Sequence, residues 1–138
     1  MAQENKWKEF EDPEFYDLEN LGRPAIFLIP HNKLKTNIYP PAYFSDGKMP
    51  LVSCESFLQS FLAETFGAFT VTQVPVFGFW HNEKMVVYDE CQQYEVSFVG
   101  KEKMKPLLRV LAHVSRSIKE ECIYVKAGQY ACLVKPVV

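Results

Sequence analysis

The sequence predicts a single α+β domain, in which an antiparallel sheet carries two helices on one of its faces. Three observations predict this fold. Apolar residues recur at helical spacing in two segments, residues 53–66 and about 101–121. Runs rich in β-branched and aromatic residues, typical of strands, lie before, between and after those segments. The length of 138 residues suits one packed core.

The composition is that of a soluble globular protein. Hydrophobic residues make up 48% of the chain and charged residues 23%. Aromatic residues reach 14%, which excludes a disordered or low-complexity chain. The apolar runs are too short to cross a bilayer, and the N-terminal residues lack the apolar core of a signal peptide. We therefore expect a cytoplasmic protein with no membrane partner.

Charge and motifs exclude several kinds of site. A net charge of −2 leaves no general electrostatic footprint for nucleic acid, so we expect no nucleic-acid partner. The four cysteines and three histidines show no zinc-ligand spacing, which predicts no metal site. The absence of a Gly-rich phosphate loop predicts no cofactor. Residues 1–20 carry seven acids and two lysines, a local −5, so the remaining thirteen bases and ten acids give +3 and allow a basic patch.

The first 22 residues form an acidic N-terminal arm in this interpretation. Asp12 before Pro13 is typical of a helix start, and Gly22 of a helix stop. The apolar face of this helix would consist of Phe15, Leu18 and Leu21. We expect a short helix that docks on the domain. The alternative is a partner-binding arm in which the acids act together with Trp7 and Phe10.

Residues 23–138 form the domain, which begins with a short buried strand at 25–29. Residues 30–52 contain four prolines, which predicts a long loop. Long ordered loops are often functional. Three aromatic side chains of this loop either line a site or anchor the loop: Tyr39, Tyr43 and Phe44.

The remaining elements follow in a regular order. A helix begins at Ser53 and ends at Gly67. Strands at 69–80 and 85–99 form a hairpin, and Pro75 and Gly78 favour an edge position or a bulge in the first of them. A second helix after Gly100 runs to about residue 121, and a closing hairpin occupies 122–134.

This β-α-β-β-α-β order, with an added C-terminal strand, is the ferredoxin-like pattern. The helices cover one face of such a sheet. The other face must be solvated, covered by the arm and the loop, or buried against a second copy of the chain. We therefore expect a homo-oligomer.

The strand at 85–99 is the most informative segment for chemistry. With a period of two, Glu90 and Gln92 share a face with Tyr88 and Tyr94. Burying an unpaired carboxylate costs several kcal/mol. Either a bulge at residues 89–91 turns Glu90 to solvent, or Glu90 faces a cavity or a subunit interface. In the second case desolvation would raise the pKa of Glu90 and suit it to general-base chemistry.

Aromatic residues lie across the hairpin from this carboxylate. Aromatic rings beside a carboxylate suit a cationic or nucleobase-bearing ligand, and they equally suit an oligomer interface. The candidate ligand-binding residues are Trp80, Phe79, Tyr88, Gln92 and Tyr94, and the candidate catalytic residues are Glu90 and His81. His81 is either an exposed turn residue or an acid–base partner of Glu90 or Glu95. A nucleophilic Cys91 that faces His81 is a further alternative, and we expect His113 to be a partly exposed helix residue.

Four segments carry a resemblance, at residues 64–71, 78–80, 94–96 and 118–126. Over residues 53–134 the chain resembles small, mostly uncharacterised ferredoxin-like proteins of bacteria and phages, whose nearest described relatives are the phage S-adenosylmethionine lyases. The resemblance implies a trimer that binds a sulfonium substrate between subunits and uses a Tyr and a Glu. Here the Gly-x-aromatic position is Gly78 to Trp80, and Glu90 is the nearest candidate for the acid.

We expect a non-catalytic phage or bacterial accessory protein that binds a protein partner or a small ligand through the open sheet face, as an oligomer. The alternative is an enzyme similar to the S-adenosylmethionine lyases, with Glu90 as the base at a subunit interface. In that enzyme Trp80, Tyr88 and Tyr94 would pack against the substrate.

Overall fold

The computed structural model describes the chain except residues 1–6, 45–49, 73–75, 84 and 138, and it describes no side chain for residue 82. The expected α+β fold with two helices and an antiparallel sheet is confirmed. The elements are the 3-10 turns η1 (Lys8–Phe10) and η2 (His31–Lys33), the helices α1 (Cys54–Phe66) and α2 (Met104–Ser117), and the strands β1 (Arg23–Pro30), β2 (Asn37–Ile38), β3 (Val52–Ser53), β4 (Thr70–Val71), β5 (Val76–Asn82), β6 (Met85–Phe98), β7 (Ile123–Ala127) and β8 (Tyr130–Val134).

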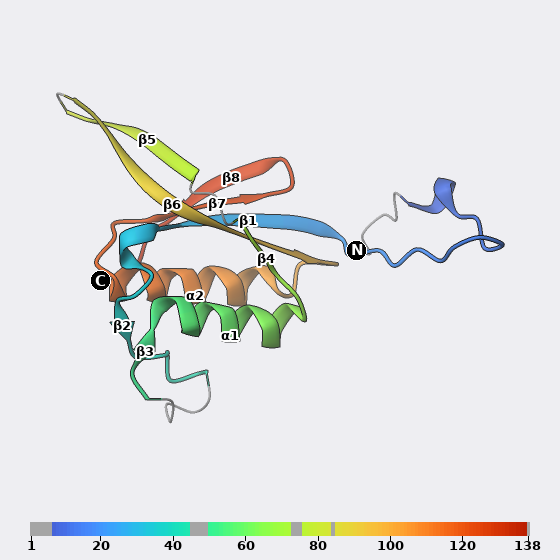
Figure 1. Ribbon diagram of the computed structural model, residues 1–138, viewed down its shortest axis with the longest axis horizontal. Coiled ribbons are helices and arrows are strands. Elements are labelled where there is room, and N and C mark those ends of the chain that lie inside the picture. The colour runs from blue at the N-terminus through green and yellow to red at the C-terminus, as the bar shows by residue number, and fades with distance from the viewer. Residues whose placement is uncertain (1–6, 45–49, 73–75, 84, 138) are drawn as a thin grey trace.

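The sheet and the helices form two layers, with α1 and α2 side by side under one face of the sheet (Figure 1). The strand order is β4-β6-β1-β7-β8, and β5 also pairs with β6. Each of these pairings is antiparallel. Strands β2 and β3 form a separate two-stranded sheet. Among the described residues, no helix is long and apolar enough to cross a membrane.

The core lies between the central strand β1 and the helices. Ala25, Phe27 and Ile29 of β1 are fully buried and alternate with half-buried residues, as a strand with one covered face requires. Phe27 pairs with Tyr94 of β6, and their rings stack with centroids 5.2 Å apart. The pairing of β1 with β6 ends where Pro30 faces Cys91, because a proline lacks the N–H that a strand ladder needs.

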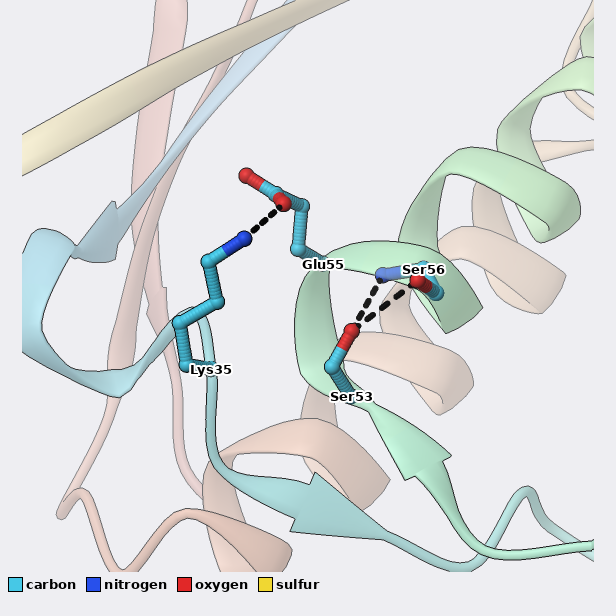
Figure 2. A network of polar contacts seen from close by, with 4 residues as sticks. All are labelled: Lys35, Ser53, Glu55 and Ser56. Carbon is cyan, nitrogen blue, oxygen red and sulfur yellow. Dashed lines mark hydrogen bonds and ion pairs between the residues drawn. The ribbon is translucent and has the colours of Figure 1, made fainter.

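Local signals fix both ends of α1, as the sequence predicts. The Ser53 hydroxyl accepts a hydrogen bond from the backbone N–H of Ser56 at 3.1 Å and donates one to the Ser56 hydroxyl (Figure 2). Lys35 from the preceding loop pairs with Glu55 in the first turn at 2.9 Å, where a carboxylate also favours the helix dipole. Gly67 ends the helix with a φ of 82°, in the left-handed region that glycine tolerates.

Helix α2 ends earlier than the sequence predicts. It stops at Ser117 rather than near residue 121. Lys119 has a φ of 62°, and the backbone N–H of Glu120 turns back to donate to the carbonyl of Ser115 at 2.9 Å. The Ser115 hydroxyl in turn donates to the Glu120 carbonyl at 2.8 Å. These two bonds close the helix end, so the last four predicted residues leave the helical path.

The long loop at 30–52 is anchored at several points. The ring of Phe44 packs edge-on against Phe57 of α1 at 5.3 Å, so this residue anchors the loop. The guanidinium of Arg109 lies 4.7 Å from the centre of the Tyr43 ring. The partly exposed His113 contacts the carbonyl of Tyr39 through Nε2 at 2.7 Å. The loop therefore packs on both helices, although its residues 45–49 lie outside the described part.

The helix predicted between Asp12 and Gly22 is wrong. The described part of the arm contains only the 3-10 turn η1 and a turn at 13–15. Phe15 is 78% exposed and Leu21 62% exposed, so most of the predicted apolar face is in contact with water in the described part of the chain. A helix of about ten residues without tertiary packing is marginal in water. The arm instead extends away from the end of the sheet (Figure 1).

The strand predicted at 69–80 is divided into β4 and β5. Val71 pairs with Tyr94, and Val76 pairs with Cys91. From Val71 to Val76 the chain advances five residues, while the paired positions on β6, Tyr94 and Cys91, are only three residues apart. The two extra residues lie between β4 and β5. Gly78 itself pairs regularly with Asp89, whereas residues 73–75 lie outside the described part of the chain.

The cap of α1 gives a stability prediction. Ser53→Ala removes the side-chain acceptor for the N–H of Ser56 and should lower the free energy of unfolding by about 1 kcal/mol. Urea denaturation measures the change. Ser60→Ala, on the exposed side of the same helix, is the matched control and should leave stability unchanged or slightly higher. Equal losses in the two variants would contradict the capping role.

Candidate functional site

The candidate site lies on a two-stranded ribbon formed by β5 and the first half of β6, residues 76–82 and 85–90. The pairing of β1 with β6 stops at Cys91, so the ribbon has no third strand among the described residues. Figure 1 shows that the ribbon projects past the ends of both helices. The described side chains on both faces of the ribbon are therefore at least partly exposed.

One face of the ribbon is rich in aromatic residues. Residues that pair directly across two strands point to the same side, and Phe77 pairs with Glu90 while Phe79 pairs with Tyr88. The Tyr88 ring lies 5.9 Å from that of Phe77 and 5.6 Å from that of Phe79. We name this the aromatic face; its members are Phe77, Phe79, His81, Val86, Tyr88 and Glu90. The three rings are 52%, 67% and 62% exposed in chain order.

Glu90 and His81 lie at opposite ends of the aromatic face. Glu90 is paired with Phe77 near the body, and His81 is paired with Val86 near the tip. Four strand steps separate them, about 13 Å, so the structure does not bring them together as an acid–base pair. Glu95 lies on the opposite face of the sheet from His81. His81 pairs with Val86, and Glu95 is an odd number of residues along β6 from Val86, so the two side chains point to opposite sides.

The predicted alternative of a bulge at residues 89–91 is wrong. β6 keeps one constant register against β5 from Met85 to Cys91 and one against β1 from Cys91 to Phe98. Glu90 is exposed all the same. The reason is that the ribbon carries it beyond the helices, rather than that a bulge turns its side chain.

Trp80 belongs to the other face of the ribbon. It pairs with Val87, one step out of phase with Phe79 and Tyr88, and is 47% exposed. Cys91 also lies on this second face and pairs with Val76, so it does not face His81. Burial, with smaller contributions from Asp89 and Glu120, raises the pKa of the Cys91 thiol to about 11. A neutral, buried thiol is a poor nucleophile.

Gln92 and Tyr94 point to the same side of β6 as Glu90, but they lie in the half of β6 that pairs with β1. Tyr94 is fully buried, and burial raises the pKa of its hydroxyl well above the ordinary value, with a further contribution from Glu55. Its hydroxyl and the Oε1 atom of Gln92 have no hydrogen-bond partner among the described residues. The structure therefore separates the candidate ligand-binding residues: Phe79 and Tyr88 are together on the aromatic face, whereas Tyr94 is part of the core.

Two members of the aromatic face were not among the sequence candidates, Phe77 and Val86. The sequence already indicates that Phe77 and Phe79 point to the same side, because they are two residues apart in a strand. It does not give the register between the two strands, which places Phe77 opposite Glu90. Within the described residues, no group of three or more His, Cys, Asp or Glu side chains is arranged to hold a metal ion.

Comparison with known proteins gives one structural likeness. No protein-family model matches the chain, and no curated protein matches it in sequence. A solved structure described as a phage SAM lyase in complex with S-methyl-5'-thioadenosine is similar, with a TM-score of 0.49 and 12% identity over 88% of this chain and 95% of that one. It is of the class that the sequence resemblance names. At that identity and TM-score, no residue role is transferred from it.

The placement of Glu90 gives a prediction. Glu90→Gln should change the free energy of unfolding by no more than about 0.5 kcal/mol, because an exposed carboxylate makes little contribution to stability. Chemical denaturation measures the change. Phe27→Ala is the positive control, because removal of this buried ring should lower the free energy of unfolding by about 3–5 kcal/mol. A clear gain in stability for Glu90→Gln would instead show a carboxylate held in an unfavourable environment.

Proposed function

We propose that the protein binds a small cationic, nucleoside-bearing ligand on the aromatic face, where that face meets a second copy of the chain, and that it acts there as a lyase on a sulfonium substrate. The observation that carries this proposal is the exposed cluster of Phe77, Tyr88 and Phe79 next to the Glu90 carboxylate. The substrate class comes from the sequence resemblance to the S-adenosylmethionine lyases.

The form of the ribbon supports a site between subunits. A two-stranded ribbon is marginally stable by itself in water, and stable sheets usually have a third strand or a packed face. This ribbon has neither among the described residues, yet it exposes large apolar side chains at Phe77, Phe79, Trp80, Met85, Val86 and Tyr88. Apolar patches of this kind mark interaction sites. A second copy would cover the ribbon and exclude water from the space beside Glu90.

The aromatic face suits the chemistry of a sulfonium substrate. The aromatic rings can stack on a nucleobase or lie against a cation, and Glu90 can pair with the positive charge of the ligand. Tyr88 and Glu90, two residues apart on the same face, place a Tyr and a Glu beside the ligand, whereas the Gly-x-aromatic position of the resemblance is Trp80 on the other face. In the reaction, the carboxylate oxygen of the substrate bonds to its own Cγ atom, and the S–Cγ bond breaks with its electron pair left on sulfur. The products are homoserine lactone and the thioether methylthioadenosine.

We also propose that the sheet is of the ferredoxin-like class. In support, β6 and β7 flank β1, each antiparallel to it, and the β5–β6 hairpin and the two helices occur in the order strand, helix, two strands, helix, strand. β8 is then an addition at the edge beyond β7.

A second candidate function is non-catalytic binding of a protein partner or a small ligand. The exposure of Glu90 and Tyr88 in a single copy favours it, because an open apolar surface with a charge at its border is typical of an interaction site. The two candidates share the surface and differ in whether a bond of the ligand is broken.

The oligomer is tested by Phe79→Ser. We expect the parent chain to form an oligomer in light scattering after size-exclusion chromatography, and the variant to shift toward a smaller species because it removes an exposed ring from the proposed interface. Tyr130→Ser removes a ring that is equally exposed, at 68%, from the other edge of the sheet and should leave the oligomer intact. A monomeric parent chain would contradict a site between subunits.

The lyase is tested by incubation of the full chain with S-adenosylmethionine, with chromatographic detection of homoserine lactone and methylthioadenosine. We expect both products, and a loss of about 100-fold or more in rate for Glu90→Gln. Glu121→Gln, an exposed acid outside the ribbon, should keep the parent rate. Binding without either product at high protein concentration would reject the lyase and favour the non-catalytic candidate.

A further inference from the structure

A pocket lies at the end of the molecule opposite the ribbon, between the start of β1, the end of β6 and the start of α2. Its volume is about 360 Å³. The lining residues are Arg23, Phe98, Gly100, Lys101, Met104, Lys105 and Leu108. This is also the end of the sheet from which the N-terminal arm leaves the body (Figure 1).

The pocket combines an apolar floor with a basic rim. Phe98 is almost fully buried, and Met104 and Leu108 are half-buried against the core. Arg23, Lys101 and Lys105 are exposed, and no lining residue is acidic. The first turn of α2 also lacks an acid, and its N-cap forms no side-chain hydrogen bond. Glu102 lies beside the rim, where its carboxylate accepts the backbone N–H of Lys101 at 3.0 Å.

The arm has the complementary chemistry. Between residues 7 and 22 it carries six acids and one lysine, a net charge of −5. Its apolar side chains are exposed, among them Phe15, Leu18 and Leu21 at 78%, 40% and 62%. Segments that alternate acids with apolar residues suit a surface in which a basic rim surrounds an apolar floor.

The base of the arm is held by local contacts at Asn20 and Gly22. The side chain of Asn20 accepts the backbone N–H of Gly22 at 3.0 Å, which forms a tight local turn. Gly22 has a φ of 83° and lies so close to the Phe98 carbonyl that an added Cβ would be 2.1 Å from that oxygen. The chain therefore leaves the body through a fixed and crowded turn, and the arm extends outward (Figure 1).

We propose that this basic, apolar pocket receives the acidic arm of a second copy of the chain. Among the described residues of one copy, the apolar side chains of the arm stay exposed and no arm residue lines the pocket, although the charges and apolar side chains of the two match. Exchange of arms would satisfy both in a closed symmetric assembly, because each copy would give one arm and receive one. The proposal rests on different residues from the proposed function and does not depend on it.

Charge reversal tests the match between arm and pocket. Lys101→Glu together with Lys105→Glu should weaken self-association about tenfold or more in sedimentation equilibrium, and so should Glu14→Lys with Asp17→Lys in the arm. The four changes combined should restore most of the association. Lys135→Glu, at an exposed position outside the pocket, is the control and should have no such effect. The series is repeated in Phe79→Ser, so that association through the ribbon does not hide the result.

Crosslinking identifies the copy that supplies the arm. A photoreactive phenylalanine analogue at position 15 is placed in full-length chains, and 14N-labelled and 15N-labelled chains are mixed before irradiation. We expect cross-links from position 15 to residues 98–108 in pairs of mixed label. Cross-links within single chains only would show that the arm folds back on its own pocket, and would overturn the proposal. No cross-link to this segment, with no effect of charge reversal, would overturn it as well.

Discussion

The antiparallel pairing of β1 with β6, and its end at Pro30, is the constraint on which the rest of this structure depends. Pairing of Ala25, Phe27 and Ile29 with the C-terminal half of β6 creates the face on which both helices pack. Past Pro30 that support is absent, because β1 ends while β6 continues for six more residues toward its start at Met85. The same 14-residue strand is thus a core strand at one end and half of an exposed ribbon at the other.

The two ends of the molecule differ in chemistry as a result. At the ribbon end, aromatic rings lie exposed with one carboxylate beside them. At the other end, a basic rim surrounds an apolar floor next to an acidic arm. Each surface leaves apolar area exposed among the described residues. Covering apolar surface is the main favourable term in association, and this is the physical basis of the two contacts proposed above.

Elements with strong local signals were predictable from the sequence. Ser53 and Gly67 mark the two ends of α1, and each acts on backbone groups a few residues away. The arm shows the limit of such signals. Asp12 and Pro13 form a reasonable helix start, but the apolar side chains that follow stay largely exposed among the described residues, and a short helix depends on such packing.

The candidate site was predictable as a segment but not as an arrangement. The sequence by itself determined which residues of β5 and β6 alternate, and therefore that Glu90 and Tyr88 share a face. Only the tertiary structure decided that Phe77 and Phe79 join them while Trp80 does not, because the register between two strands depends on how they pair. It also decided that Tyr94 is in the core and Tyr88 in water, since burial depends on where β1 and the helices end.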